Sequence, residues 1–405
     1  MHDTRPEPRY TVLLTCSTTA RLPEGTAFTV ERFPVSTTPV DVQFCTRYED
    51  IGMEAPLPRE LYAETSVTGG DFQDAIAASE QAANVLTPLM SLASNAFVPE
   101  FQLQLAYETT PGAARRQFKQ WFYGDPVPVL PLLPGRLLDP DLTWVVVGHV
   151  LQHPEGERIH RACVQYQEAL RSWLPQRELR AVAHLFMAVE ALTKALLRQE
   201  CEQRSIDADG LCAEWGIEKK ELDGEIRRRL IFHGDRQCYK TMKDVSDGLE
   251  HGFLAFPKLH DMAARCRDTG GRHIREAILQ FLHLPSDAYE RLVSATYERP
   301  VSGHGVIRAI EGVFVGEGVL AAPGAAHPFF EWTVPIKAVE RRGTDHVITM
   351  QDNATLHCAD GIQFTATGHG ANVPIPDATV DVVRGKTNLS SSDEEATHRV
   401  DTSGS

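Results

Sequence analysis

Residues 177–200 read RELRAVAHLFMAVEALTKALLRQE, and the spacing of their apolar side chains decides the central part of the fold. Apolar residues recur here at the three- and four-residue intervals of one helical face: Leu179, Val182, Phe186, Val189 and Leu196. The stretch therefore predicts a long amphipathic helix whose apolar stripe packs into a core.

The helical period continues on both sides of this stretch and predicts an all-helical domain at 157–299. Residues 1–124 instead hold short runs rich in Val, Thr and Phe, separated by Pro and Gly, which favour strands. Within them, residues 74–95 have a helical pattern, and Pro88 is expected to kink that helix. We therefore expect a β-rich N-terminal domain with one long helix.

The remaining segments are shorter. Residues 125–156 begin with the Pro-rich run DPVPVLPLLPGRLLDP and predict an extended connector, with TWVVVGHVL as a strand-length apolar run. Residues 300–385 return to strands and Gly-rich turns, which predict a small β-rich module. Residues 386–405 are polar and Ser-rich and predict a disordered tail. The predicted fold class is α+β, a central helical bundle flanked by β-rich N- and C-terminal regions.

Composition limits the function classes. The chain has 405 residues and 42 % hydrophobic side chains, enough for two or three globular domains. Its net charge of −15 excludes a diffuse attraction to nucleic acid, so any RNA contact requires a local basic patch. The eight cysteines are scattered without a CxxC pair, which is typical of reduced thiols.

The sequence also bears on location. The polar start MHDTRPEPRY and the short apolar run after it do not resemble a signal peptide, and no window approaches the roughly 20 apolar residues of a membrane span. We expect a cytoplasmic protein without a membrane partner.

The segment EIRRRLIFHGD, residues 225–235, contains the candidate catalytic residues. Arg228 and His233 are five positions apart, which places them on different faces of a regular helix unless the helix ends or distorts at the histidine. Gly234 is the residue type that ends helices in a left-handed conformation, and such an end would let His233 turn into a groove or toward a partner subunit.

An arginine, four residues, a histidine and a glycine, preceded upstream by a helix reading FMAVEAL, together resemble the Apea-like HEPN domain family of the HEPN ribonuclease superfamily. The helices that follow, YKTMKDVSDGLEHGFLAFPKLHDMAARC and HIREAILQFLHLP, fit the same arrangement. The resemblance covers about a third of the chain. One departure is Arg229, because the family commonly has a small polar residue directly after the arginine.

The resemblance implies a helical domain that forms a homodimer and brings two such motifs into one cleft, where RNA is cut without metal or cofactor. Arg228 and His233 are the implied catalytic residues, His233 as the base for the RNA 2′-hydroxyl and Arg228 as the cation beside the phosphate. Arg227, Arg229 and Glu190 are supporting candidates. Proteins of this kind often act as defence or toxin effectors.

Other interpretations stay open. The arginines can simply complement the dipole of a helix that Gly234 caps. Glu190 can orient the histidine or an arginine, although an ion pair with Lys194 is the favoured interpretation. The domain can also be a non-catalytic dimerisation or nucleotide-binding module, with the N-terminal domain binding a partner.

Two further patterns receive simpler interpretations. Arg115, Arg116 and Lys119 beside Trp121 could form an RNA platform, but such a mixture is more often the flank of an amphipathic element. GKT at 385–387 lacks the first glycine of a phosphate loop. The sequence predicts no metal site.

Overall fold

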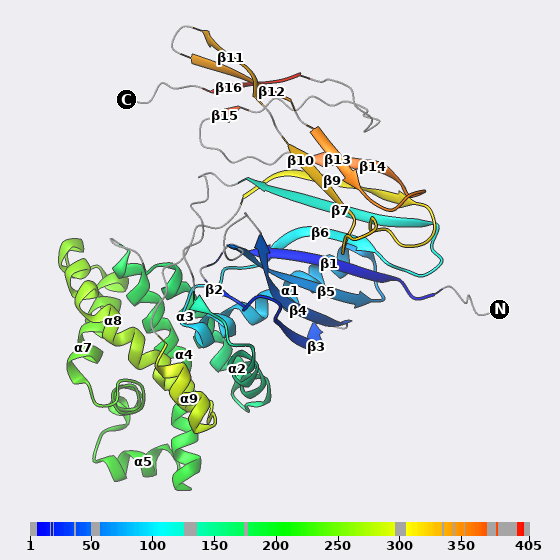
Figure 1. The fold of residues 1–405 in the computed structure, drawn as a ribbon. Helices are drawn as coiled ribbons and strands as arrows, with labels where there is room; N and C mark the ends of the chain where they lie inside the picture. Colours follow the sequence, from blue (N-terminus) through cyan, green and yellow to red (C-terminus); the bar gives the residue numbers. More distant parts are fainter. Residues whose placement is uncertain are drawn as a thin grey trace.

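The computed structural model describes residues 6–16, 18, 20–35, 38–49, 57–124, 136–173, 177–295, 305–333, 336–342, 345–351, 353–370, 378–379 and 395–400. It is a mixed α+β structure, in which helices gather beside a large antiparallel sheet (Figure 1). None of the helices in these ranges combines the length and the apolar character that a bilayer span requires.

The sheet has eight antiparallel strands in the order β14-β9-β7-β6-β1-β5-β4-β3. Its strands are β1 (Arg9–Cys16), β3 (Ala27–Val35), β4 (Thr38–Glu49), β5 (Leu57–Thr68), β6 (Gln102–Glu108), β7 (Arg115–Gly124), β9 (Gly305–Val315) and β14 (Gln363–Gly370). The central strand β1 is buried on both faces, since Val12 and Leu14 lie in one apolar core and Leu13 in a second.

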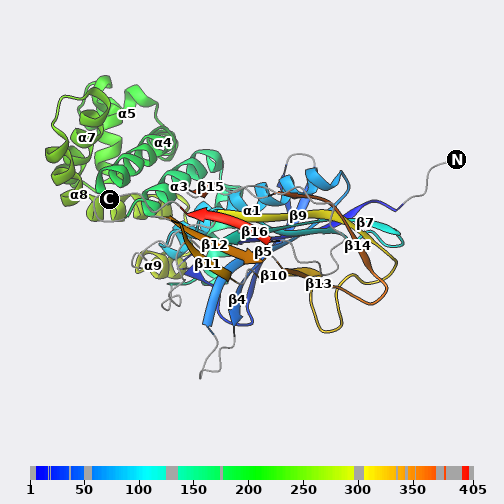
Figure 2. The same cartoon turned by 90° about the horizontal axis from the view of Figure 1, so that it is seen from above.

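Helix α1 (Phe72–Ser94) covers one face of the sheet, and β10 (Phe329–Thr333) with β13 (Asn353–His357) covers part of the other (Figure 2). The helix begins where the Asp71 carboxylate accepts a hydrogen bond from the backbone N–H of Asp74 at 2.8 Å. It continues through Pro88 and ends at Asn95, which has a left-handed backbone.

Eight α-helices follow among the described residues: α2 (Pro140–Gln152), α3 (Gly156–Arg171), α4 (Glu178–Arg204), α5 (Ala208–Trp215), α6 (Leu222–Ile226), α7 (Arg236–His251), α8 (Phe256–Phe281) and α9 (Ser286–Val293). Helix α4 packs against α3, α7 and α8. Leu179, Val182, Phe186, Val189 and Leu196 are all buried, so the predicted apolar stripe of this helix is confirmed.

One continuous core joins the helices to the sheet. Helix α1 contacts both α2 and α3, and a single apolar cluster runs from the sheet through these helices to α8. Arg275 of α8 adds a polar connection, because its buried guanidinium donates hydrogen bonds to the carbonyl oxygens of Leu92, Ala93 and Leu292 at 3.0, 3.3 and 2.5 Å. These contacts join α8 to the carboxyl ends of α1 and α9.

The structure corrects three boundaries. Residues 140–152 of the expected connector form α2, because Asp139 caps the helix and Pro140 suits its first position. The expected module at 300–385 is not separate, since β9 pairs with β7 and β14 pairs with β9 in the N-terminal sheet. The expected tail at 386–405 contains the strand β16 (Glu395–Val400), which pairs with β12 (Asp345–Gln351).

Four further short strands of the described chain lie outside the large sheet. Strands β11 (Ile336–Arg342) and β15 (Ala378–Thr379) join β12 and β16 in a four-stranded sheet. Strands β2 (Ala20–Arg21) and β8 (Arg136–Leu137) form a small parallel pair. The GKT residues 385–387 and most of the Pro-rich run lie outside the described residues.

Candidate functional site

The chain between α6 and α7 is a wide turn that positions His233. Arg227–Ile231 are π-helical, the Phe232 N–H donates to the Arg227 carbonyl at 3.0 Å, and the Gly234 N–H donates to the Arg228 carbonyl at 2.9 Å. Such widened turns occur frequently at functional sites. The distortion that the spacing of Arg228 and His233 requires is therefore present.

His233 and Gly234 both have left-handed backbones, with φ of 48° and 85°. Phe232 anchors the turn, since it is fully buried and its ring contacts those of Tyr239 and His273. His233 next to it keeps 31 % of its side chain exposed. The turn thus holds a buried aromatic ring and an accessible imidazole side by side, and the histidine adopts a conformation that non-glycine residues rarely take.

The three arginines of the turn all have partners within the chain. Nε of Arg228 donates to Glu225 at 2.9 Å and Nη2 donates to the other oxygen of the same carboxylate, while Arg229 donates to Glu225 at 2.9 Å and lies 4.3 Å from the ring centroid of Trp215. Arg227 donates to the Thr193 hydroxyl at 3.0 Å. The pKa of Glu225 is lowered to about 2, mainly by the hydrogen bond from Arg228 and further by that from Arg229.

The ion pair expected between Glu190 and Lys194 is replaced by two others. Lys194 contacts Asp223 at 2.8 Å, and Glu190 lies 3.8 Å from Nη2 of Arg227. The alternative role, in which Glu190 orients an arginine, matches this placement, although the arginine is Arg227 and not Arg228.

His233 lies beside two polar residues, Glu276 and His273, and His273 contacts a third, Asp235. Nε2 of His233 lies 3.9 Å from Glu276, and its ring centroid lies 5.6 Å from that of His273. His273 in turn places Nε2 3.4 Å from the Asp235 carboxylate. Burial and then the neighbouring His273 lower the pKa of His233, while Glu276 opposes the shift. Its surroundings therefore favour the neutral imidazole.

Two of the basic side chains of β7 have partners within the chain. Arg116 is 5 % exposed and donates to the carbonyls of Ala113 and Gly318, and Lys119 forms an ion pair with Glu311 at 2.9 Å. Because side chains alternate between the two faces of a strand, Arg115, Lys119 and Trp121 share one face, and Nζ of Lys119 lies 5.2 Å from the Trp121 ring centroid. The alternation fits the amphipathic interpretation, and the RNA platform stays a prediction.

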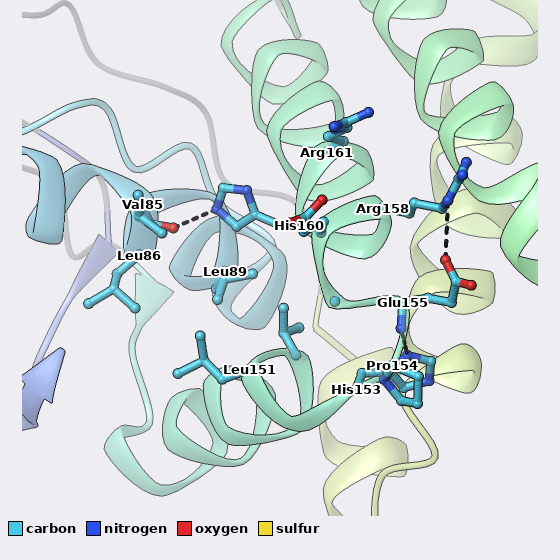
Figure 3. Close-up of a pocket in the computed structure, with 13 residues that line it drawn as sticks. Val85, Leu86, Leu89, Leu151, His153, Pro154, Glu155, Arg158, His160 and Arg161 are labelled. Atoms are coloured by element: carbon cyan, nitrogen blue, oxygen red, sulfur yellow. Dashed lines mark hydrogen bonds and ion pairs between the residues drawn. The ribbon is translucent and has the colours of Figure 1, made fainter. Parts of the chain in front are cut away.

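Two pockets lie away from the turn. One of about 710 Å³ lies between α1 and the start of α3, where Leu86, Leu89 and Leu151 form its apolar wall (Figure 3). Two of its polar groups meet other protein groups: His160 contacts the Val85 carbonyl at 2.8 Å, and Glu155 binds Arg198. A second pocket of about 790 Å³ lies on the opposite face of the sheet and includes Tyr62, Gln120 and His327.

The described residues around His233 form a cluster of titratable side chains, which is not by itself a complete active site. It brings His233 together with His273, Glu276 and Asp235, and it keeps the guanidinium of Arg228 on Glu225. His273 and Glu276 had a local signal, because the sequence HIRE places them three residues apart, on one face of a helix. Only the fold shows that this face meets His233.

Comparison of the chain with protein-family models, with curated proteins and with solved structures finds no match.

Proposed function

We propose that the chain is a metal-independent endoribonuclease of HEPN type, with His233 as its base and Arg228 as its phosphate-binding cation. One observation carries the proposal: an accessible imidazole stands at the end of a π-helical turn that contains three arginines. A base and a cation on one short segment are the two groups that RNA transesterification requires.

The reaction uses the nucleophile that RNA itself contains. His233 takes the proton of the 2′-hydroxyl, the 2′-oxygen attacks phosphorus, and the bond from phosphorus to the 5′-oxygen breaks. The leaving 5′-oxygen takes a proton from water. The products are a 2′,3′-cyclic phosphate and a 5′-hydroxyl, and the guanidinium of Arg228 stabilises the charge on the phosphoryl oxygens.

The proposal includes a homodimer through the helical domain. Within one chain the Arg228 guanidinium is held by Glu225, so its engagement with phosphate requires exchange of that carboxylate for the phosphate. Two copies of the turn in one cleft would supply a second arginine and a second histidine to the same RNA.

The same ion pair favours a second candidate, a non-catalytic dimerisation or nucleotide-binding module. An arginine that is paired within its own chain can serve a structural role, and the net charge of −15 disfavours binding of a long polyanion such as RNA. The pocket beside Tyr62 would then mark the N-terminal sheet as the part that binds a partner.

Cleavage of a mixed RNA pool in chelator separates the two candidates. The full chain, His233→Ala and the control His260→Ala on α8 are compared, and the ends of the products are identified. The ribonuclease predicts cyclic-phosphate ends that disappear only in His233→Ala. Absence of cleavage, or equal cleavage by all three proteins, excludes it and favours the binding module.

A further inference from the structure

We propose that His233, His273 and Glu276 form a binding site for one zinc ion. One ligand atom from each residue lies within 4.8 Å of the other two. The sequence predicted no metal here, and the inference stands whether or not the chain cleaves RNA.

The donor set matches the chemistry of zinc. Two imidazoles and one carboxylate are typical zinc ligands and leave a fourth tetrahedral position for water. His273 and Glu276 lie three residues apart on α8, so the helix presents both on one face, and His233 approaches from the turn before α7.

The spacing of the three ligand atoms suits zinc after small side-chain movements. Ligands about 2.1 Å from a tetrahedral zinc lie about 3.4 Å from one another. The ligand atoms here are within 4.8 Å, and Nε2 of His233 is 3.9 Å from Glu276. Rotation of the side chains closes that difference, because His233 and Glu276 are partly exposed, with 31 % and 23 % of their side chains accessible.

His273 provides the independent observation that points to a ligand. Its side chain is only 12 % exposed, its Nε2 faces Asp235, and its Nδ1 is buried without a hydrogen-bond partner among the described residues. If Nε2 carries the proton toward Asp235, then Nδ1 holds an unshared lone pair. A buried polar atom without a partner is costly, and a metal ion would satisfy it.

Asp235 is a positioning residue, because it acts on the site through His273. Histidines that bind metal usually donate their second ring N–H to a carboxylate, which fixes the tautomer and raises the basicity of the ligand nitrogen. Asp235 also accepts a hydrogen bond from the Cys238 N–H at 2.9 Å, so the start of α7 holds the carboxylate in place. The left-handed backbone of His233 also points to a ligand site, because strained residues of this kind cluster at such sites.

The test uses the full chain, stripped of metal and titrated with Zn²⁺ by calorimetry and with Co²⁺ by visible absorption. We expect one Zn²⁺ per chain and a Co²⁺ spectrum of four- or five-coordinate geometry. His233→Ala, His273→Ala and Glu276→Gln should each weaken binding at least tenfold, and Asp235→Asn about tenfold. His260→Ala and Glu250→Gln should bind as the unmodified chain does.

Zn²⁺ should also raise the melting temperature of the unmodified chain and leave that of Glu276→Gln unchanged. This near-isosteric variant decides the question if His273→Ala does not fold, and circular dichroism without metal checks the fold of each variant. Absence of saturable one-to-one binding, or equal binding by Glu276→Gln and the unmodified chain, overturns the site. Neither result depends on a nuclease assay.

Discussion

Arg228 donates hydrogen bonds from Nε and Nη2 to the two carboxylate oxygens of Glu225. Arg228 lies five residues before His233, where the wide turn ends. Both partners are mostly shielded, with 16 % and 22 % of their side chains exposed. The pair fixes the arginine that the proposed chemistry needs, and it also contributes to the stability of the domain.

The first prediction concerns this contribution. The lowered pKa of Glu225, about 2 against a usual 4.5, stabilises the fold above pH 4.5, and the contribution is lost as the pH falls toward 2. Glu225→Gln should therefore lower the free energy of unfolding by about 1–2 kcal/mol at neutral pH, because the pair is partly solvated. Urea unfolding should show this difference shrinking as the pH is lowered below about 5. Glu250→Gln, at an exposed position of α7, is the control, and a difference independent of pH would contradict the argument.

The second prediction separates the arginines. If the ribonuclease proposal holds, Arg228→Ala should lower the cleavage rate by about 100-fold or more, the loss typical when an oxyanion-stabilising donor is removed. Arg229→Ala should cost less than about tenfold, because Arg229 lies over the Trp215 ring. Single-turnover rates on one RNA measure both.

Arg228→Lys refines the comparison, since lysine keeps the charge but not the planar two-point contact. Parallel urea curves correct for lost stability. Equal losses in Arg228→Ala and Arg229→Ala would show that the assignment of Arg228 is wrong.

The third prediction combines the two proposals. A zinc ion on His233 occupies the nitrogen that would take the proton of the 2′-hydroxyl, so Zn²⁺ should suppress RNA cleavage and chelator should restore it. Glu276→Gln should cleave RNA yet resist Zn²⁺. Mg²⁺ serves as the control ion, since it prefers oxygen ligands. Suppression of the variant and the unmodified chain at the same Zn²⁺ concentration would place the inhibitory ion elsewhere.

The fourth prediction concerns Arg275, whose guanidinium donates to three carbonyl oxygens and is fully buried. Arg275→Met should lower the free energy of unfolding by about 3 kcal/mol, because it leaves those carbonyls without donors in the core. Arg272→Met, at an exposed position of the same helix, should change it by less than about 0.5 kcal/mol. Urea unfolding of the two variants gives the comparison, and an Arg275→Met protein as stable as the unmodified chain would refute it.

Local sequence signals predicted the elements whose period is long and regular. The stripe of α4 and the strands of residues 1–124 are present, and the helix ends before His233 and Gly234 as their residue types suggested. Helix α2 was missed because its valines favour strands, although Asp139 and Pro140 formed a proper helix start.

Local sequence patterns do not predict contacts between distant segments. The pairing of β7 with β9 joins residues on either side of the helices, and no local pattern encodes it. The same limit applies to the site. His233 stood out through its neighbours in sequence, whereas His273 and Glu276 acquire meaning only because α8 packs beside the turn.

The position of β9 has a consequence for synthesis of the chain. Because β9 pairs with β7 but follows the helices in sequence, the ribosome makes the whole helical segment while the edge of β7 still lacks its neighbour. An open edge with free backbone groups recruits other strands and promotes aggregation. Pairing of β9 and then β14 moves the free edge of the sheet from β7 to β14, so chains released before residue 305 would leave the ribosome with β7 itself as the exposed edge.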